Sequence, residues 1–347
     1  MSSPESPKVP PSETTKVIPS MDENLKLVSK IEEKAVKMEE LINQGKQAEK
    51  EGQPALVALI KRQVETLLFE ALTLRKQIEG ETSPESTLFS EAQELLGREN
   101  VLGPEEVEKT FNVRLEKVPA IPFSAEDLNR AKKLNQMLVL RVDKTEDGQP
   151  LSLEVMNNIL TTRWKKEGKG ELLRTPEGWK GVLGDGFKND APRAGWALVG
   201  KEVLPNSISK NYVEQTELIV TTLEKEVFKG ITIPKEYTEA IAEFESNKKR
   251  LTKLMDEDWK QAAKELSELK ISKLTRPTAE EVIYDLALYQ DTHNKRLLSN
   301  RYTWVSSLSS DGCLGSVGYF GSGVVRGPGW RPGYRNVNLG ASFSRSM

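Results

Sequence analysis

The chain has 347 residues, of which 37% are hydrophobic and 29% are charged, and its formal net charge is -2 at pH 7. This length allows more than one domain, and the low hydrophobic fraction indicates that part of the chain is extended or disordered. The near-neutral charge argues against nucleic acid and anionic membranes as partners, and a single cysteine excludes an internal disulfide and a multi-cysteine metal site.

Residues 1–21 are polar and rich in proline, so we expect a disordered arm that cannot bury enough apolar surface to offset the cost of ordering. No apolar run reaches the length of a signal-peptide core or a membrane span. We therefore expect no membrane span and a cytoplasmic location, with a virion-associated or non-Sec surface location as the alternative.

Residues 22–80 carry two heptad patterns that predict two amphipathic helices. Between them, residues 43–53 contain two glycines, and Pro54 is well placed at the start of the second helix. We expect an antiparallel helical hairpin, with a coiled coil through which copies self-associate as the alternative. The two apolar stripes are Val28, Ile31, Ala35, Met38 and Ile42, and then Ile60, Val64, Leu67, Ala71, Leu74 and Ile78.

Residues 81–117 are predicted to form a helical adaptor, with short helices at 84–96 and 104–111 and a strand near 113–115. We assign no chemistry to this segment. The main domain is expected at 118–347. Its first part should contain helices at 125–135, from 152 onward, at 209–228 and at 234–269, and strands at 137–142 and 196–204.

Later in this domain, Thr278 and Glu281 have the spacing of a capping box that opens a helix, with Val282, Leu286 and Tyr289 on its inward face. Period-two patterning then predicts short strands at 303–306, 314–320, 323–325 and 339–344, the last of which should close the sheet. Helices feeding short strands indicate the α+β class.

The segment 302–345 differs in composition from the rest of the chain. It holds nine of the 24 glycines and seven of the 22 aromatic residues, and it contains no lysine. Glycine permits sharp turns, and tyrosine and tryptophan supply large rigid contact surfaces. Arginines stand near aromatic residues at Arg326, Arg331 and Arg335, but without lysine we favour a protein or glycan ligand over nucleic acid.

Residues 305–342 lack Lys, Glu, Gln and Met, and their one tryptophan is Trp330. These five residue types cannot be reached when an AAC or AAT codon for Asn is changed at its first two positions. A glycine-rich surface strand lacking long charged side chains is the alternative explanation.

No catalytic or metal site is expected. The single histidine, His293, lies in a polar run and should be an exposed helix-end residue, and nothing near Cys313 in the sequence would activate its thiol. Asp185 and Asp190 lack EF-hand spacing and indicate a turn, and GSVGYFGSG fits no nucleotide-binding pattern. We expect no cofactor and no enzyme activity.

Three stretches resemble a known family: RPTAEEVIYDLALY (276–289), YTWVSS (302–307) and LGASFSR (339–345). They are similar to the closing part of the C-type lectin fold in formylglycine-generating-enzyme-like domains, where a helix with a PTEAEWE-like opening leads to a W-S-S strand and a final GFR strand. The similarity extends to the variable proteins of diversity-generating retroelements, whose carboxy-terminal coding region is copied from a template with mutations at adenines, mostly in Asn codons.

The resemblance covers about residues 119–347 and is specific only after residue 274. It implies a C-type-lectin-like domain with a helical insertion, carried on the helical stalk, and a variable region at about 305–342. The chain lacks the disulfides and the EPN and WND calcium motifs of sugar-binding lectins, and it lacks the cysteine pair of sulfatase-modifying oxidases. Calcium-dependent glycan binding and catalysis are therefore not expected.

The resemblance also assigns roles to residues. The scaffold would include Tyr302, Trp304, Asp311, Gly312, Phe320, Trp330, Leu339, Phe343 and Arg345. The diversified, ligand-facing positions would be among Leu308, Cys313, Gly315, Ser316, Tyr319, Gly321, Ser322, Val324, Arg326, Tyr334, Arg335, Asn336 and Val337. The expected function is binding of variable partners; the alternative is a fixed adhesin or structural component of a virus particle or cell surface.

Overall fold

The computed structural model describes residues 21–78, 84–173, 176–322, 325–327 and 329–346. The arm predicted at the amino terminus lies outside these residues, apart from its last position. The chain divides into two compact units, Met1–Leu88 and Phe89–Met347. The second unit thus includes most of the segment predicted as an adaptor, 81–117, together with the predicted main domain, 118–347; the finer division stays a prediction.

In the first unit, α1 (Met21–Lys50) and α2 (Pro54–Ile78) form a helical hairpin closed by the turn at 51–53. Ala48 and Ile60 are buried between the helices, and a Cβ at Gly45 would lie 3.3 Å from Ile60 Cγ2, so the helices approach closely there. Lys34 forms an ion pair with Glu70 across the hairpin. On α2 the predicted stripe from Ile60 to Leu74 is buried or half-buried, whereas on α1 three predicted members, Val28, Ala35 and Ile42, are exposed. The residues one position earlier, Leu27, Lys34 and Leu41, are half-buried instead, so the stripe on α1 was predicted partly wrongly.

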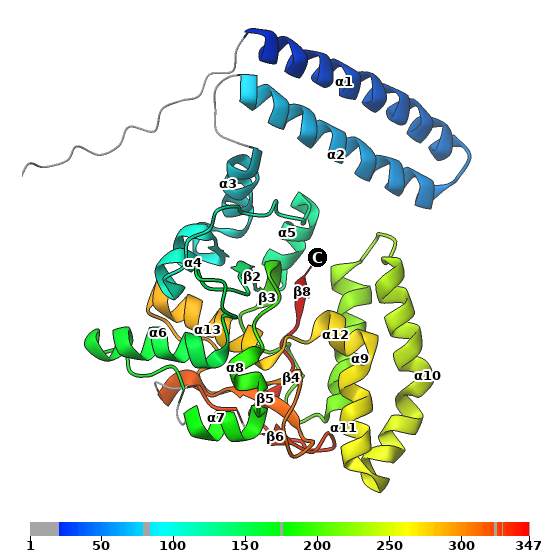
Figure 1. Ribbon diagram of the computed structural model, residues 1–347. Coiled ribbons are helices and arrows are strands. Elements are labelled where there is room, and N and C mark those ends of the chain that lie inside the picture. The colour runs from blue at the N-terminus through cyan, green and yellow to red at the C-terminus, as the bar shows by residue number, and fades with distance from the viewer. Residues whose placement is uncertain (1–20, 79–83, 174–175, 323–324, 328, 347) are drawn as a thin grey trace, which may run out of the picture. The chain divides into compact units, whose positions relative to one another are not determined.

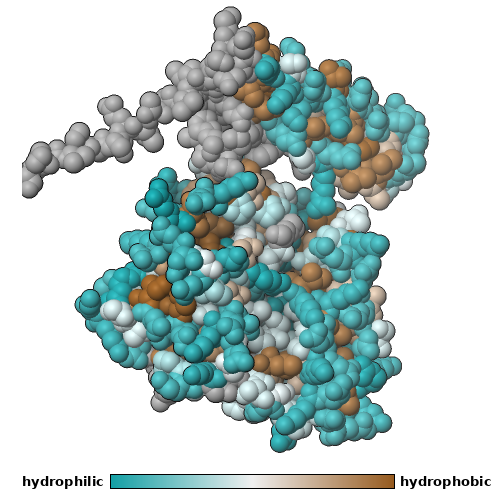
Figure 2. Space-filling model, viewed as in Figure 1, coloured by the Kyte–Doolittle hydropathy of each residue, from teal (hydrophilic) through white to brown (hydrophobic). Residues whose placement is uncertain are grey.

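The apolar face of this hairpin is wider than the helix contact. Figure 2 shows hydrophobic residues on its outer surface, and two of the predicted core residues, Val28 and Ile42, are 40% and 44% exposed. Self-association through 22–80 stays a prediction. None of the helices in the described residues has the length and hydrophobicity of a membrane span. The large exposed hydrophobic residues of the hairpin are Leu25, Val28, Val36, Ile42, Leu56, Leu59 and Leu68.

The second unit contains two four-stranded sheets, in agreement with the predicted α+β class (Figure 1). The first has the order β1-β2-β3-β8 and the second has the order β6-β5-β4-β7. The strands of the first are β1 (Val101–Leu102), β2 (Gln136–Arg141), β3 (Gly195–Gly200) and β8 (Ser344–Ser346). Those of the second are β4 (Tyr302–Leu308), β5 (Leu314–Gly318), β6 (Gly329–Trp330) and β7 (Leu339–Gly340).

Two strand predictions were wrong. Residues 113–115 form no strand: they follow the left-handed Asn112 at the end of a helix, and Leu115 N donates to the Glu108 side chain at 2.7 Å. The single strand expected at 339–344 is split: β7 pairs with β4, and β8 pairs with β3 in the other sheet. Between them the backbone crosses close to Val203, since a Cβ at Gly340 would lie 2.6 Å from Val203 Cβ. The strand expected at 323–325 lies largely outside the described residues.

Helices surround the two sheets. α3 (Pro84–Leu96), α4 (Pro104–Phe111), α5 (Ala125–Lys133), α6 (Leu153–Lys166), α7 (Pro176–Leu183) and α8 (Gly186–Asn189) come from the amino-terminal part of the unit or follow β2. A helical layer then follows β3, formed by α9 (Tyr212–Thr222), a π-helix (Leu223–Val227), α10 (Lys235–Glu257), α11 (Trp259–Glu268) and α12 (Lys270–Thr275). Its buried residues share one core with Trp304, Leu314 and Leu339 of the second sheet.

The helix predicted at 234–269 is interrupted at Asp258. This residue leaves helical geometry with φ -146° and ψ 85°, and its carboxylate accepts a hydrogen bond from Gln261 N at 3.1 Å. It therefore ends α10 and caps α11.

The central helix is α13 (Ala279–His293), which is buried continuously from Ala279 to Asp291 and contacts β2, β4 and β5. The predicted capping box is confirmed: Thr278 Oγ1 accepts from Glu281 N at 3.3 Å, and Glu281 Oε2 accepts from Thr278 N at 2.9 Å. A helix buried on all sides must satisfy its first N–H groups internally, because water cannot reach them.

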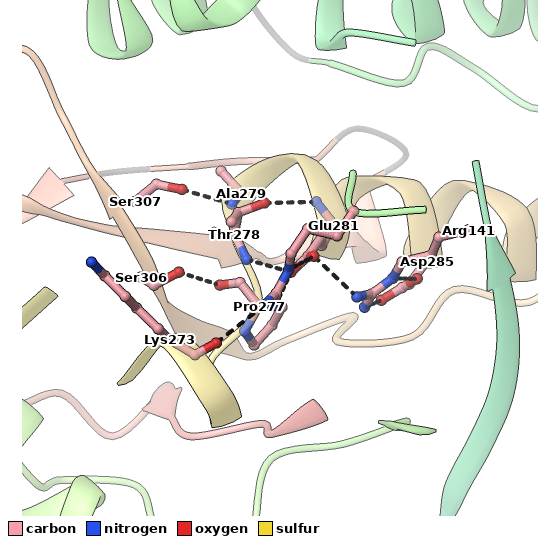
Figure 3. A network of polar contacts seen from close by, with 10 residues as sticks. Arg141, Lys273, Pro277, Thr278, Ala279, Glu281, Asp285, Ser306 and Ser307 are labelled. Atoms are coloured by element: carbon pink, nitrogen blue, oxygen red, sulfur yellow. Dashed lines mark hydrogen bonds and ion pairs between the residues drawn. The ribbon is translucent and has the colours of Figure 1, made fainter. Parts of the chain in front are cut away.

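A network of polar contacts fastens the start of α13 to both sheets (Figure 3). Arg141 of β2 donates two hydrogen bonds to Asp285, at 3.0 and 2.6 Å, and its Nη1 lies 3.4 Å from Glu281 Oε1. Arg193 donates to the same Glu281 oxygen at 2.7 Å. Buried Arg141 and half-exposed Arg193 thereby pair with two buried carboxylates.

On the other side of the helix start, β4 is held by hydrogen bonds from two serines. Ser306 N donates to Pro277 O at 3.0 Å, and Ser307 Oγ accepts from Ala279 N at 3.0 Å (Figure 3). The same helix end thus fixes β2 of the first sheet and β4 of the second.

Replacement of Arg141 by Met should destabilise the second unit by about 3–5 kcal/mol, because it leaves two buried carboxylates with their main partner removed. Urea denaturation measures this loss. The matched control is Lys253→Met at the exposed pair with Glu257, which should cost no more than about 0.5 kcal/mol. Equal losses in the two variants would contradict a structural role for the Arg141 network.

The pKa of Glu281 makes this network sensitive to acid. Burial alone would raise it, but the charges of Arg141 and Arg193 and hydrogen bonds to its carboxylate lower it to about 2. A carboxyl whose pKa is lowered on folding stabilises the protein above its unfolded pKa, and this contribution is lost as the pH falls toward the folded value. Burial raises the pKa of Asp285 to about 6, against the opposing charge of Arg141. The contribution of Asp285 to the free energy of unfolding therefore changes with pH in the opposite direction to that of Glu281.

The difference in unfolding free energy between the wild type and Glu281→Gln should therefore be largest above pH 5, on the order of 3 kcal/mol, and should narrow as the pH falls toward 3. Asp285 is present in both proteins, so its titration largely cancels in the comparison. Denaturant titrations at several pH values measure the difference. A gap that stays constant across this range would contradict the lowered pKa of Glu281.

Candidate functional site

The turn before β5 contains Asp311 and Gly312, which the resemblance assigned to the scaffold. Ser309 N donates to Cys313 O at 2.8 Å, and Asp311 Oδ1 accepts from Cys313 N at 3.3 Å and from Ser309 Oγ. Gly312 has a φ of 85°, in the left-handed region that favours glycine. Asp311 is exposed, yet its role is to close this turn.

Cys313 is only 8% exposed. Burial and the neighbouring Asp311 carboxylate raise the pKa of its thiol. A thiol that stays protonated at neutral pH is a poor nucleophile. Cys313 is therefore a packing residue of this turn.

A continuous row of contacts begins at the other end of β5. The guanidinium of Arg326 lies 5.4 Å from the ring centre of Tyr319, and this ring stacks on Tyr302 at 5.2 Å. The backbone N–H of Tyr302 donates to Asn338 O at 2.7 Å. The row thus passes from the strands into the loop at 331–338.

Within that loop, Asn338 N donates to Asn336 Oδ1 at 2.8 Å, and Asn336 Nδ2 donates to the Tyr334 hydroxyl at 3.0 Å. The Tyr334 ring stacks on Trp330 at 4.3 Å, with 7° between the planes. All members of the row are half-buried. We call this set the aromatic row: Arg326, Tyr319, Tyr302, Asn338, Asn336, Tyr334 and Trp330.

The helical layer supports the loop that carries half of this row. Arg335 donates two hydrogen bonds of 3.0 Å to Glu214, which also closes the capping box of α9 with Asn211. The backbone adds Tyr212 N to Pro332 O and Ser209 N to Asn336 O, both at 3.0 Å. The helical layer therefore fixes the loop at three points: one ion pair and two backbone hydrogen bonds. The side chains of the aromatic row in this loop remain partly accessible.

The aromatic row offers stacking faces, amides and one guanidinium, and it contains no carboxylate. Nearby, Arg331 and Lys260 lie 5.0 and 5.4 Å from the ring centre of Trp259. Aromatic and arginine side chains of this kind are the residues that most often carry binding energy at protein interfaces. The described members of the row therefore combine flat aromatic faces with amide and guanidinium hydrogen-bond donors.

The predicted ligand-facing residues fall into distinct groups. Arg335, Val337 and Gly321 are exposed, whereas Cys313 and Ser316 are buried and were wrongly placed on the surface. Both errors arise because the side chains of β5 and its turn point into the core, which composition does not reveal. Val324 lies outside the described residues, as does the side chain of Ser322. The half-buried members of the set are Leu308, Gly315, Tyr319, Arg326, Tyr334 and Asn336.

Two of the predicted positions have no room for a side chain. A Cβ at Gly315 would lie 2.8 Å from Val305 Cγ2, and one at Gly321 would lie 2.6 Å from Ser299 O. Real Cβ atoms essentially never approach another heavy atom so closely. These glycines are required by the backbone rather than available for exchange.

The residues predicted as scaffold are placed more accurately. Trp304, Phe320, Leu339, Phe343 and Arg345 are buried, and Gly312 is half-buried in its turn. Arg345 lies 3.3 Å from Asp127 and between the rings of Phe123 and Phe228. Tyr302 and Trp330 support the fold and also contribute to the aromatic row. Sequence reasoning missed Asn338 and Trp259, for which no local pattern gives a signal.

Within the described residues, no three His, Cys, Asp or Glu side chains converge as a metal site would require. His293 ends α13 as expected, but it is half-buried against Tyr289 at 4.5 Å rather than exposed, and this burial lowers its pKa. Asp185 and Asp190 flank the short helix α8.

Comparison with known proteins finds no matching family model, no matching curated protein and no matching solved structure.

The close approach of the strands at Tyr319 can be tested at Gly318. Its φ is 147°, and a Cβ there would lie 2.2 Å from Arg301 O. Gly318→Ala should therefore destabilise the protein by at least about 2 kcal/mol, measured by urea denaturation. Gly333→Ala is the control, because nothing lies within 4 Å of its Cβ position; an equal loss there would contradict the argument.

Proposed function

We propose that this chain is a ligand-binding protein in which a C-type-lectin-like scaffold presents a surface diversified by a retroelement. The observation that carries the proposal is the network at the start of α13. The helix opening RPTAEE and the strand YTWVSS are the stretches on which the resemblance rests, and they bond directly through Ser306 to Pro277 and Ser307 to Ala279. This direct contact between the two motifs supports the proposal.

The course of the chain after α13 also favours this scaffold. The helix leads to β4, which holds the W-V-S-S residues, and the final strand β8 holds Ser344 and Arg345. Between them, the glycine-rich segment forms β5, β6 and the loop at 331–338, where the aromatic row lies. Fixed strands thereby carry an exchangeable surface, as in other proteins whose binding residues lie on loops of a rigid framework.

The backbone at Tyr319 supports the diversification part of the proposal. Its φ of 54° lies in the left-handed region, which Tyr rarely adopts and Asn tolerates. Four of the seven non-glycine residues with positive φ in the described structure are asparagines. A single change of A to T at the first position of an AAC or AAT codon converts Asn to Tyr, so the conformation fits an ancestral Asn.

The geometry narrows the set of exchangeable positions. Buried Cys313 and Ser316 and the closely packed Gly315 and Gly321 are poor candidates, because most new side chains there would disrupt the core. The remaining described positions are half-buried or exposed and are the better candidates for exchange, although Arg335 also holds the loop through Glu214. They are Leu308, Tyr319, Arg326, Tyr334, Arg335, Asn336 and Val337.

The nucleotide sequence of the locus tests the proposal. We expect a reverse-transcriptase gene near this gene and a second copy of the segment that encodes 302–345, differing only where that copy has adenine. At position 319 the copy should encode Asn. A Tyr codon there would contradict our explanation of the Tyr319 backbone, and a locus with neither feature would leave a fixed binding surface, such as that of an adhesin.

A further inference from the structure

The helical hairpin presents two long faces beside the contact between its helices. The a and d positions of a heptad repeat form that contact; they include Leu27, Ile31 and Leu41 on α1 and Ile60 and Val64 on α2. Because the two helices are antiparallel, the e positions of both helices lie on one side of the contact, and the g positions of both lie on the other. The two faces therefore carry different residues.

The face that contains the e positions and the neighbouring b positions carries an exposed apolar stripe. Leu25 is 61% exposed at one end of the stripe on α1, and Leu68 is 49% exposed on α2. An exposed stripe of this kind marks an interaction surface. We call this side of the hairpin the apolar face, and its described apolar residues at e and b positions include Leu25, Val28, Ala35, Ile42 and Leu68.

The opposite face, with the g and c positions, has a different character. Its exposed leucines, Leu56 and Leu59, both lie on α2 close to the turn at 51–53. Along α1 it is polar and mostly charged, so only the apolar face offers an apolar stripe along α1. The polar residues of α1 on this opposite face include Lys26, Lys30, Glu33, Lys37, Glu40, Gln44 and Gln47.

The size of the apolar face suits an interface between two copies of the chain. With 25 residues, α2 is about 37 Å long, and two adjacent helices are together about 20 Å wide. Such a face buries on the order of 700 Å² on each copy. Specific protein interfaces bury about 600–1,000 Å² on each partner. Two hairpins that cover each other's apolar face would form a four-helix bundle of ordinary dimensions.

The charges on this face distinguish between two ways of pairing. Among its described side chains, α1 contributes three carboxylates and one lysine, whereas α2 contributes two basic groups. Packing α1 of one copy on α2 of the other brings opposite charges together, and packing α1 on α1 brings like charges together. These side chains are Glu32, Glu39, Lys46 and Glu49 on α1, and Lys61 and Arg75 on α2.

We propose that two copies of this chain pair through the apolar face, with α1 of each copy packed on α2 of the other. The two-fold axis then runs parallel to the helices. A second copy is the partner that fits, because one face supplies both the acidic and the basic half of the complementary pattern, as a two-fold symmetric interface requires.

This inference goes beyond the proposed function. All residues of the apolar face lie in the first unit, far in sequence from 305–342. The pairing would hold whether or not the carboxy-terminal surface is diversified, and failure of either idea leaves the other intact.

Analytical ultracentrifugation of the full chain tests the pairing. We expect a reversible monomer–dimer equilibrium with a dissociation constant in the micromolar range. Ile42→Glu and Leu68→Glu should each raise this constant about tenfold or more, because each places a carboxylate in the apolar interface. The matched controls are Val36→Glu and Leu59→Glu, at positions that are 59% and 53% exposed but lie off the apolar face. They should leave the constant unchanged.

Disulfide cross-linking tests which helices face each other. The ion pair between Lys34 and Glu70 places Ala35 and Leu68 at nearly the same level of the hairpin. In a mixture of Ala35→Cys and Leu68→Cys chains, oxidation should therefore join one chain of each kind. Ala35→Cys alone should not cross-link to itself, because the two copies of α1 lie diagonally across the bundle. The wild type, whose Cys313 is buried, is the control and should stay uncross-linked.

A full chain that is monomeric at all concentrations would overturn the proposal. So would association that survives both substitutions on the apolar face, equal weakening by all four glutamate substitutions, or efficient cross-linking of Ala35→Cys to itself. Circular dichroism verifies that each variant keeps its helices. If one substitution on the apolar face unfolds the hairpin, the other substitution and the cross-linking still decide the outcome.

Discussion

The fold of the second unit depends on the polar contacts that let α13 lie in its interior. A helix buried along most of its length must satisfy its first N–H groups without water, and the Thr278–Glu281 box does so locally. Glu281 is then paired with Arg141 and Arg193, and Asp285 is paired with Arg141. The single helix end thereby fixes one strand of each sheet.

The candidate binding surface is held in place by the same contacts at the start of α13. β4 carries Tyr302 at one end and is bonded to the start of α13 near the other, through Ser306 and Ser307. Tyr302 in turn stacks on Tyr319 and bonds Asn338, and the helical layer holds the loop through Arg335 and Glu214. A surface held in this way presents side chains at low entropic cost, which favours binding.

Local signals in the sequence predicted much of this scaffold. The Thr278–Glu281 spacing is complete within four residues, and the apolar runs of β2 and β3 reveal buried strands directly. The partner of Asp285, by contrast, is Arg141, which is 144 residues away, and no local pattern identifies it. The division of 339–344 between two sheets likewise depends on where Val203 and Ser207 lie in space.

The residues of the candidate binding surface were predicted less completely than those of the scaffold, because their burial also depends on residues distant in the sequence. Composition predicts a surface for 302–345, but most of its described residues are buried or half-buried, and Ser316 is buried within β5. Backbone crowding at Gly315 and Gly321 also cannot be read from composition, because it arises from Val305 and Ser299. The aromatic row itself is formed by contacts between separate turns and strands.

The central claim is that the start of α13 holds β4, and with it the aromatic row, in place. Native-state hydrogen exchange of the Ser306 amide, which donates to Pro277 O, tests this most directly. In the wild type this amide should open only with the core amides of α13, and in Arg141→Met both should exchange faster by the same factor. Exchange at Ser306 that is independent of α13 in either protein would contradict the account.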